Sequence, residues 1–279
     1  MKRSLFISII SILIATAGSG LLAGQETNPD RIAVAFSDPS RPGLLKVHML
    51  QGSISVKAYN GKEVIIVSQQ RVNNTRSRSR SDVDTQGLRR LDTSGAGLVV
   101  DEANNVMTIG TDSWNRSGNL DIQVPTTTNL QLKTVNGGAI VVEGVDGDIE
   151  ADNNNGSVAL NDVAGSVVAH SLNGKVTATL KRVTPQKAMS FSSLNGTVDV
   201  TLPADVKANV KLVTDNGDVW TDFDIQLKAN PPATVRDNRS QGGRIRIERD
   251  RSILGTINGG GPDFQLQSMN GNIYIRKIK

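Results

Sequence analysis

The chain has 279 residues, with 31 basic and 27 acidic side chains, a net charge of +4 at pH 7, two histidines and no cysteine. The missing cysteine excludes disulfides and thiol chemistry, and two histidines are too few for a His-rich metal cluster within one chain. The nearly balanced charge gives no reason to expect nucleic-acid binding, and the nine aromatic residues among plentiful Val, Ile, Thr, Asn and Gly favour β-structure.

Residues 1–24 have the pattern of a secretory signal peptide. Lys2 and Arg3 precede an apolar run over 5–14, and small residues follow it. The run is short for a membrane span, although a short N-terminal membrane anchor is the alternative. The pattern therefore predicts an exported protein, located in the periplasm, at the cell surface or outside the cell. Because no cysteine is present, a lipid attached to one is excluded.

Residues 25–43 contain Pro29, Pro39 and Pro42 among polar residues. We predict an irregular leader with one short strand near 32–36. A single β-repeat domain is predicted over 44–279, since strand-like patterns begin there. The first two, at 54–56 and 64–67, each follow a glycine.

An arginine-rich segment at about 71–97 interrupts the strand pattern. Its serines and few aspartates accompany six arginines: Arg71, Arg76, Arg78, Arg80, Arg89 and Arg90. One hypothesis is an electropositive loop that binds anionic lipid, polysaccharide or nucleic acid. The alternative is a solvated insertion, and no aromatic residue is interleaved for stacking on nucleic-acid bases. Strands are predicted again at 106–109 and 120–124.

A repeat with a period of 18 residues covers 136–180. Ile140 is followed at this step by Val158 and Val176, and the small turn residues recur with them. Farther along, the turns are spaced more widely, where Pro185 and Pro203 are inserted. The predicted structural turns are Asn136, Gly137, Gly147, Gly156, Gly165, Asn173, Gly174, Asn195, Gly196, Asn216, Gly217, Asn270 and Gly271.

Asn and Gly tolerate positive φ, so turns of this kind fit either a hairpin or a corner of a coil. The 18-residue step favours an all-β, β-solenoid or β-helix-like fold, in which equivalent residues stack one coil above the next. An antiparallel β-meander or a sandwich is the alternative. A clear strand at 273–275 is expected to close the sheet.

The recurring Asn-Gly turns, the strand ending at Val124-Pro125, the run 143–149 and the closing 270–273 together resemble a bacterial family of unknown function described as putative adhesins. That family is related to the head domains of autotransporter adhesins. The resemblance covers roughly 44–279. It implies an exported, β-helix-like domain without catalytic residues, and it does not account for the arginine-rich segment.

An acidic stripe is the best candidate for catalysis. It consists of carboxylates that alternate along one strand: Asp146, Asp148, Glu150 and Asp152. Any half-buried strand requires such alternation, so the pattern alone does not indicate catalysis. Sites that cleave sugars usually have aromatic residues beside their acids, and both tryptophans lie far from the stripe in sequence. His170 is predicted to point outward. We therefore predict no catalytic site, cofactor or metal.

The predicted function is that of an exported adhesin or scaffold that presents a repetitive β surface to a macromolecular partner. That partner is an envelope polysaccharide, an anionic surface or a protein, and nucleic acid is not expected. The alternative is a β-helix carbohydrate-active enzyme, either a polysaccharide lyase or a hydrolase.

Overall fold

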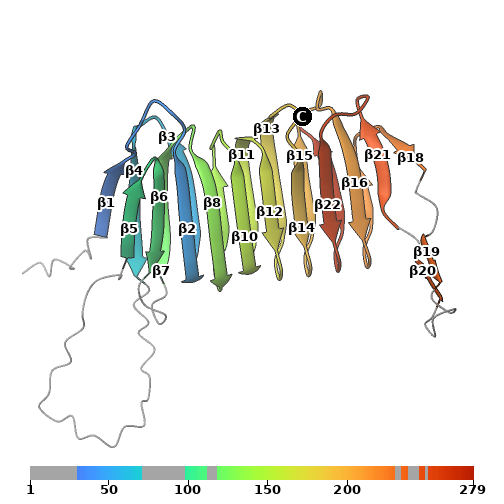
Figure 1. The fold of residues 1–279 in the computed structure, drawn as a ribbon, viewed down its shortest axis with the longest axis horizontal. Helices are drawn as coiled ribbons and strands as arrows, with labels where there is room; N and C mark the ends of the chain where they lie inside the picture. The colour runs from blue at the N-terminus through green and yellow to red at the C-terminus, as the bar shows by residue number, and fades with distance from the viewer. Residues whose placement is uncertain (1–29, 71–97, 112–117, 230–233, 238–244, 249–250) are drawn as a thin grey trace, which may run out of the picture.

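The computed structural model describes residues 30–70, 98–111, 118–229, 234–237, 245–248 and 251–279 (Figure 1). These residues form β-strands and their connections, in two large mixed sheets and one two-stranded sheet of β19 (Thr234–Asp237) and β20 (Ile245–Glu248). Within the described ranges, no helix is long and apolar enough to cross a membrane. The predicted signal peptide and the arginine-rich segment at 71–97 lie outside the described residues.

The first sheet has ten strands. In spatial order they are β1 (Asp30–Ala35), β4 (Glu63–Gln70), β7 (Gly118–Pro125), β3 (Ile54–Tyr59), β9 (Ile140–Glu143), β11 (Val158–Gly165), β13 (Val176–Val183), β15 (Val198–Leu202), β23 (Ile273–Lys277) and β17 (Val219–Thr221). One strand of this order, β1, comes from the segment predicted to be an irregular leader, where a strand near 32–36 was expected.

The second sheet has eleven strands. In spatial order they are β18 (Ile225–Lys228), β21 (Ile253–Ile257), β16 (Ala208–Thr214), β22 (Asp263–Ser268), β14 (Met189–Ser193), β12 (Val167–Ser171), β10 (Ile149–Asn155), β8 (Asn129–Asn136), β2 (Leu44–Gln51), β6 (Val106–Thr111) and β5 (Leu98–Ala103). From β8 to β15 the chain alternates between the two sheets, one strand in each.

This alternation explains the 18-residue period. In the first sheet, Val158 pairs in parallel register with Ile140 on one side and Val176 on the other. All three side chains are fully buried, which confirms the predicted inward stacking. Because these strands are parallel, the antiparallel meander is wrong for the repeat. The two-layer arrangement fits the sandwich alternative.

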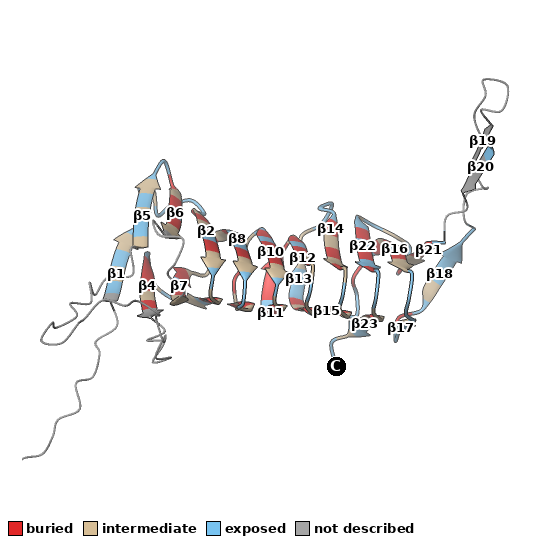
Figure 2. Ribbon diagram, turned by 90° about the horizontal axis from the view of Figure 1, so that it is seen from below, coloured by how far each residue is buried: buried red, intermediate tan, exposed pale blue. Residues whose placement is uncertain are grey.

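The core lies between the two sheets (Figure 2). Along most of the repeat strands, a buried residue, usually apolar, alternates with a more exposed one, as in Val198–Leu202. Branched aliphatic side chains suit a pleated surface of which one face is covered, so the alternation of the sequence directly produces the two-layer core.

The order of the strands differs from the order of the sequence at both ends. In the first sheet, β7 lies outside β3, and β23 lies between β15 and β17. In the second sheet, β6 lies outside β2, and β22 lies between β14 and β16. The expectation that the last strand closes the sheet is therefore wrong, because β23 has a parallel partner on each side.

Antiparallel strands cover three of the four ends of the sheets. In the first sheet β4 pairs antiparallel with β7 and β1, and in the second sheet β5 covers β6 and β21 covers β16. The fourth end is the three-residue strand β17, whose outer edge has no partner within the described chain. Unpaired strand edges invite further pairing, and a very short edge strand limits that risk.

Candidate functional site

The turn glycines form a column along one edge of the two sheets. A Cβ on Gly156 would overlap the carbonyl oxygen of Gly138, and the same holds between Gly174 and Gly156, and between Gly196 and Gly174. The column continues through Gly271 to Gly217. Glycine is thus required at these positions because successive turns approach closely there.

This finding corrects the reason given for the Asn-Gly turns. Among the predicted turn residues, only Gly137 and Gly165 have positive φ, at 88° and 115°. Gly137 stands beside the column, whose member at this turn is Gly138. Gly147, on the opposite edge, approaches Thr128 and is in turn approached by Gly165.

The turn asparagines form a hydrogen-bonded ladder. Each side-chain amide donates to the side-chain oxygen of the next member, over distances of 2.7–2.9 Å, in the spatial order Asn216, Asn270, Asn195, Asn173, Asn155 and Asn136. A second, buried row of hydroxyls donates to the glycine column, as Ser171 does to the Gly156 carbonyl at 2.8 Å. The turn residues therefore hold the turns of neighbouring strands against one another.

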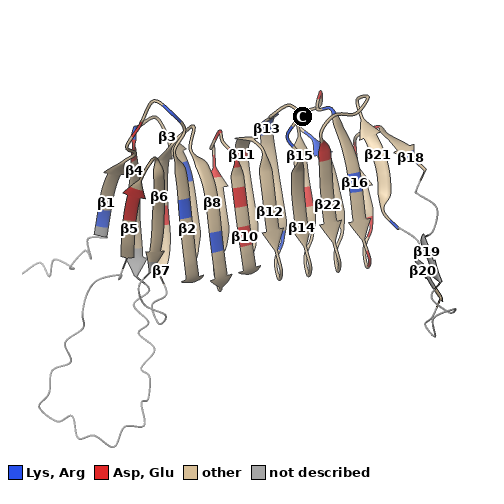
Figure 3. Cartoon of the chain, in the orientation of Figure 1, with Lys and Arg blue, Asp and Glu red and all other residues tan. Residues whose placement is uncertain are grey.

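The predicted acidic stripe lies at and before β10, and each of its carboxylates has a partner. The Asp146 carboxylate pairs with Arg182 at 2.6 Å, Asp148 with Lys187 at 2.6 Å, and Asp152 with Lys133 at 3.1 Å. The Glu150 carboxylate accepts a hydrogen bond from the Gln131 amide at 3.1 Å. The acidic positions of β10 lie next to a basic position of the neighbouring strand β8 (Figure 3).

Asp148 has the wrong electrostatics for a general acid. The hydrogen bonds from Lys187 and Ser166 lower the pKa of its carboxyl group, and burial only partly opposes them. A carboxylic acid that protonates a leaving group near neutral pH needs a raised pKa. Within the described residues, no group of three His, Asp or Glu side chains could hold a metal ion.

His170 lies on β12 between the buried Ala169 and Ser171, and its Nδ1 is 2.8 Å from the Ser192 hydroxyl. This matches the predicted outward orientation. The six arginines of the predicted anion-binding loop belong to the segment outside the described residues.

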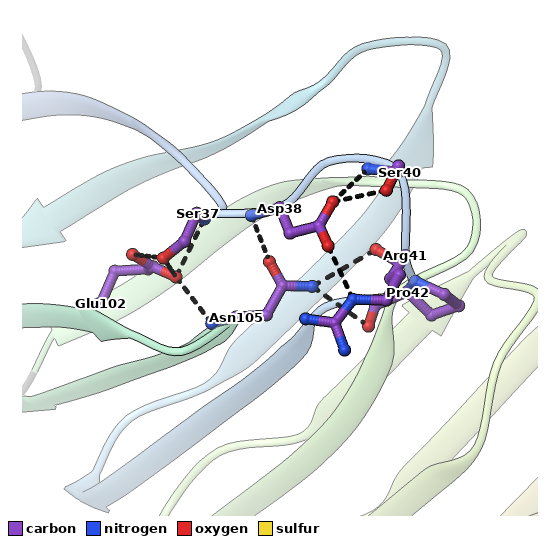
Figure 4. Close-up of polar contacts among 7 residues, drawn as sticks. All are labelled: Ser37, Asp38, Ser40, Arg41, Pro42, Glu102 and Asn105. Carbon is purple, nitrogen blue, oxygen red and sulfur yellow. Dashed lines mark hydrogen bonds and ion pairs between the residues drawn. The ribbon is translucent and has the colours of Figure 1, made fainter.

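A polar network fixes the loop that joins β1 and β2 (Figure 4). The Ser37 hydroxyl donates to the Glu102 carboxylate at 2.6 Å, and the Asp38 amide donates to the Asn105 side chain at 2.8 Å. Hydrogen bonds from Ser40 and Arg41 lower the pKa of Asp38 to about 2. The pKa of Glu102 is lowered as well, chiefly by the Ser37 hydroxyl.

A cavity of about 250 Å³ lies beside this loop. Phe36 and Tyr59 contribute aromatic surface, and its charged lining residues are Arg41 and Lys62. The volume is below the range of about 300–1,000 Å³ that is usual for small-molecule pockets. Arg41 is already engaged by Asp38 at 2.7 Å.

Two aromatic residues meet on the outer face of the first sheet. Trp220 on β17 and Tyr274 on β23 are direct partners in the parallel register. The pair was not predicted from the sequence, because Trp220 and Tyr274 lie on strands that are far apart in the chain. The insertion of β22 and β23 between earlier strands makes them neighbours. An alignment of the two Asn-Gly turns at 216–217 and 270–271 is the signal that could have found it.

The described chain is thus an all-β protein of two packed mixed sheets with largely polar outer faces. No family model matches the sequence. No curated protein matches it significantly.

Two solved structures are similar over 90% of this chain. One is a putative cell adhesion protein from Clostridium sporogenes ATCC 15579, covered over 100% of its length, with 10% identity and a TM-score of 0.34. The other is a putative adhesin from Bacteroides fragilis NCTC 9343, covered over 98% of its length, with 12% identity and a TM-score of 0.39.

Proposed function

We propose that the protein is an exported, non-catalytic adhesin or scaffold of the cell envelope or cell surface, which presents a repetitive β surface to a macromolecular partner. One observation carries the proposal: each carboxylate of the acidic stripe is engaged by a neighbouring side chain. These interactions hold the polar side chains in place on the strands, so the face suits contact over several coils and offers no poised acid and base.

The proposed architecture is a β-solenoid related to autotransporter adhesin heads, in which each coil contributes one strand to each sheet. The parallel registers at the 18-residue step and the glycine column support it. The domain boundaries proposed from the sequence go with it: a signal peptide at 1–24 and a single β-repeat domain over 44–279. The proposed partners are an envelope polysaccharide, an anionic surface or a protein.

The alternative, a polysaccharide lyase or hydrolase, needs the acidic stripe to act on a sugar. Retaining glycosidases place two carboxyl groups about 5–5.5 Å apart, with one of raised pKa. Here the pKa of Asp148 is lowered, and Asp152 is paired with Lys133. The electrostatics therefore favour the binding function.

The test combines localisation with an activity assay. Antibody labelling of intact cells should detect the protein outside the cytoplasm, and N-terminal sequencing should place its first residue between 18 and 25. Incubation of the purified protein with envelope and plant polysaccharides should release no products. Products that disappear in a variant with Asp148→Asn and Asp152→Asn would establish the enzyme instead.

A further inference from the structure

The aromatic pair on the first sheet points away from the core. The residues that flank Tyr274 along β23, Ile273 and Ile275, are buried, so the alternation of the strand directs Tyr274 outward. Trp220 shares its register and therefore its face, and its side chain is 57% exposed. Neighbouring parallel strands are about 4.8 Å apart, so the two side chains lie in adjacent rows.

Tyr274 is held in a fixed position. Its hydroxyl accepts a hydrogen bond from the Asn272 amide at 3.1 Å, and the Arg276 guanidinium lies 4.9 Å from the centre of its ring. Arg276 is itself anchored by two hydrogen bonds to the Asp199 carboxylate, at 2.9 and 3.4 Å. Arg276 thus covers one side of the ring and orders it before any ligand arrives, which lowers the entropy cost of binding on the ring surface that remains.

Trp220 is placed to receive a ligand. It lies on the edge strand, and among the described residues no hydrogen bond of its side chain is found. Trp combines a large apolar ring with one polar group, and a flat platform of this kind packs against the C–H face of a pyranose ring.

The surroundings favour a neutral, polar ligand. Near the pair, the Asp199 carboxylate is neutralised by Lys175 and Arg276, and the Asp222 carboxylate accepts a hydrogen bond from the Lys277 backbone amide. The outward residues of β15 are Asp199 and Thr201, and those of β13 include Thr177 and Thr179 as well as Lys181 and Arg182, which are paired with Asp162 and Asp146. These groups are polar, unlike the apolar core that a protein interface contains.

We propose that Trp220 and Tyr274 form a stacking platform for a neutral polysaccharide, with Asn272, Thr201 and Asp199 as polar groups at its rim. This inference rests on the proposed function and assigns it a ligand class and a site. Among the described residues, β17 is the last strand of its sheet, so the platform lies at that end of the sheet.

The test is electrophoresis of the purified protein through native gels that contain hydroxyethyl cellulose, xylan or galactomannan. We expect at least one gel to retard the protein, and Trp220→Ala and Tyr274→Ala to abolish that retardation. Tyr274→Phe should keep it, because the ring remains. Leu227→Ala is the matched control, since Leu227 is 73% exposed on β18 of the other sheet. Melting temperatures of all variants should show that each is folded.

The outcomes separate the platform from the proposed function. Retardation that survives Trp220→Ala, or no retardation in any of the three gels, overturns the platform and leaves the adhesin proposal in place. A dimer that Trp220→Ala dissociates would make a second copy of the chain the occupant, and it would also overturn the polysaccharide. Cleavage of the polysaccharide would overturn the proposed function itself.

Discussion

Gly174 gives the sharpest test of how the coils stack. Its φ is not positive, yet a Cβ at this position would overlap the carbonyl oxygen of Gly156 in the neighbouring coil. Two hydrogen bonds depend on the same close approach. The Ser171 hydroxyl donates to the Gly156 carbonyl at 2.8 Å, and the backbone N–H of Asn173 donates to the backbone carbonyl of Asn154 at 2.9 Å.

We therefore expect Gly174→Ala to destabilise the protein substantially. Forcing extra volume into a packed contact costs about 1–3 kcal/mol, and the weakening of two hydrogen bonds adds about 1 kcal/mol. The total of about 2–4 kcal/mol corresponds to a fall in melting temperature of roughly 4–16 °C for a domain of this size.

Differential scanning calorimetry of the purified variant measures this fall. Gly110→Ala is the control, because a Cβ on Gly110 meets nothing within 4 Å and its φ is not positive. Gly137→Ala tests whether a positive φ alone makes glycine necessary. The φ of Gly137 is 88°, and a Cβ at this position would meet no atom within 4 Å. A Gly174→Ala variant that melted with the Gly110→Ala variant would refute the close-approach argument.

Three further predictions concern the core, the loop between β1 and β2, and the arginine-rich segment. Val158→Asp should lose at least about 4 kcal/mol, because it places an unpaired charge in the core, whereas Ala159→Asp on the outer face should change stability by less than about 0.5 kcal/mol in urea unfolding. Because the pKa of Asp38 is lowered from 3.8 to about 2, its ionised form stabilises the fold above pH 4, and this contribution is lost as the pH falls to 2. Melting temperatures recorded over that window should depend less on pH in Asp38→Asn than in the parent, and equal slopes would show that the network contributes nothing. Replacing Arg76, Arg78 and Arg80 by Ser should remove retention on heparin and leave the melting temperature unchanged, while unaltered retention would place anion binding elsewhere.

The sequence predicts the repeated part of the fold well. The recurrence of Ile140, Val158 and Val176 at one period already specifies which residues stack and which face they bury, because the side-chain alternation of a strand permits one assignment. The physical role of the turns was harder to predict. Glycine satisfies both a positive φ and a close backbone contact, and only the spatial neighbour tells which of the two applies at Gly156 or Gly174.

The order of the coils could not be read from the sequence. Turns such as Asn195-Gly196, Asn216-Gly217 and Asn270-Gly271 are chemically equivalent, so any of them can stack on any other. The neighbourhood of Trp220 and Tyr274 follows from that order, and the candidate platform was missed for this reason. The acidic stripe was predicted as a set of residues, but its partners Lys133, Arg182 and Lys187 belong to other coils.

The insertion of β22 and β23 affects how the chain acquires its structure. β22 pairs in parallel with β14 on one side and with β16 on the other. Until residues 263–277 have been synthesised, β14 and β16 therefore each expose an unpaired edge. During that time the two edges can pair with each other and form a shorter stack, from which the C-terminal strands would be excluded. A protein built this way depends on its last strands to keep these two edges apart, so loss of its C-terminal end would leave β14 and β16 free to pair in a non-native order.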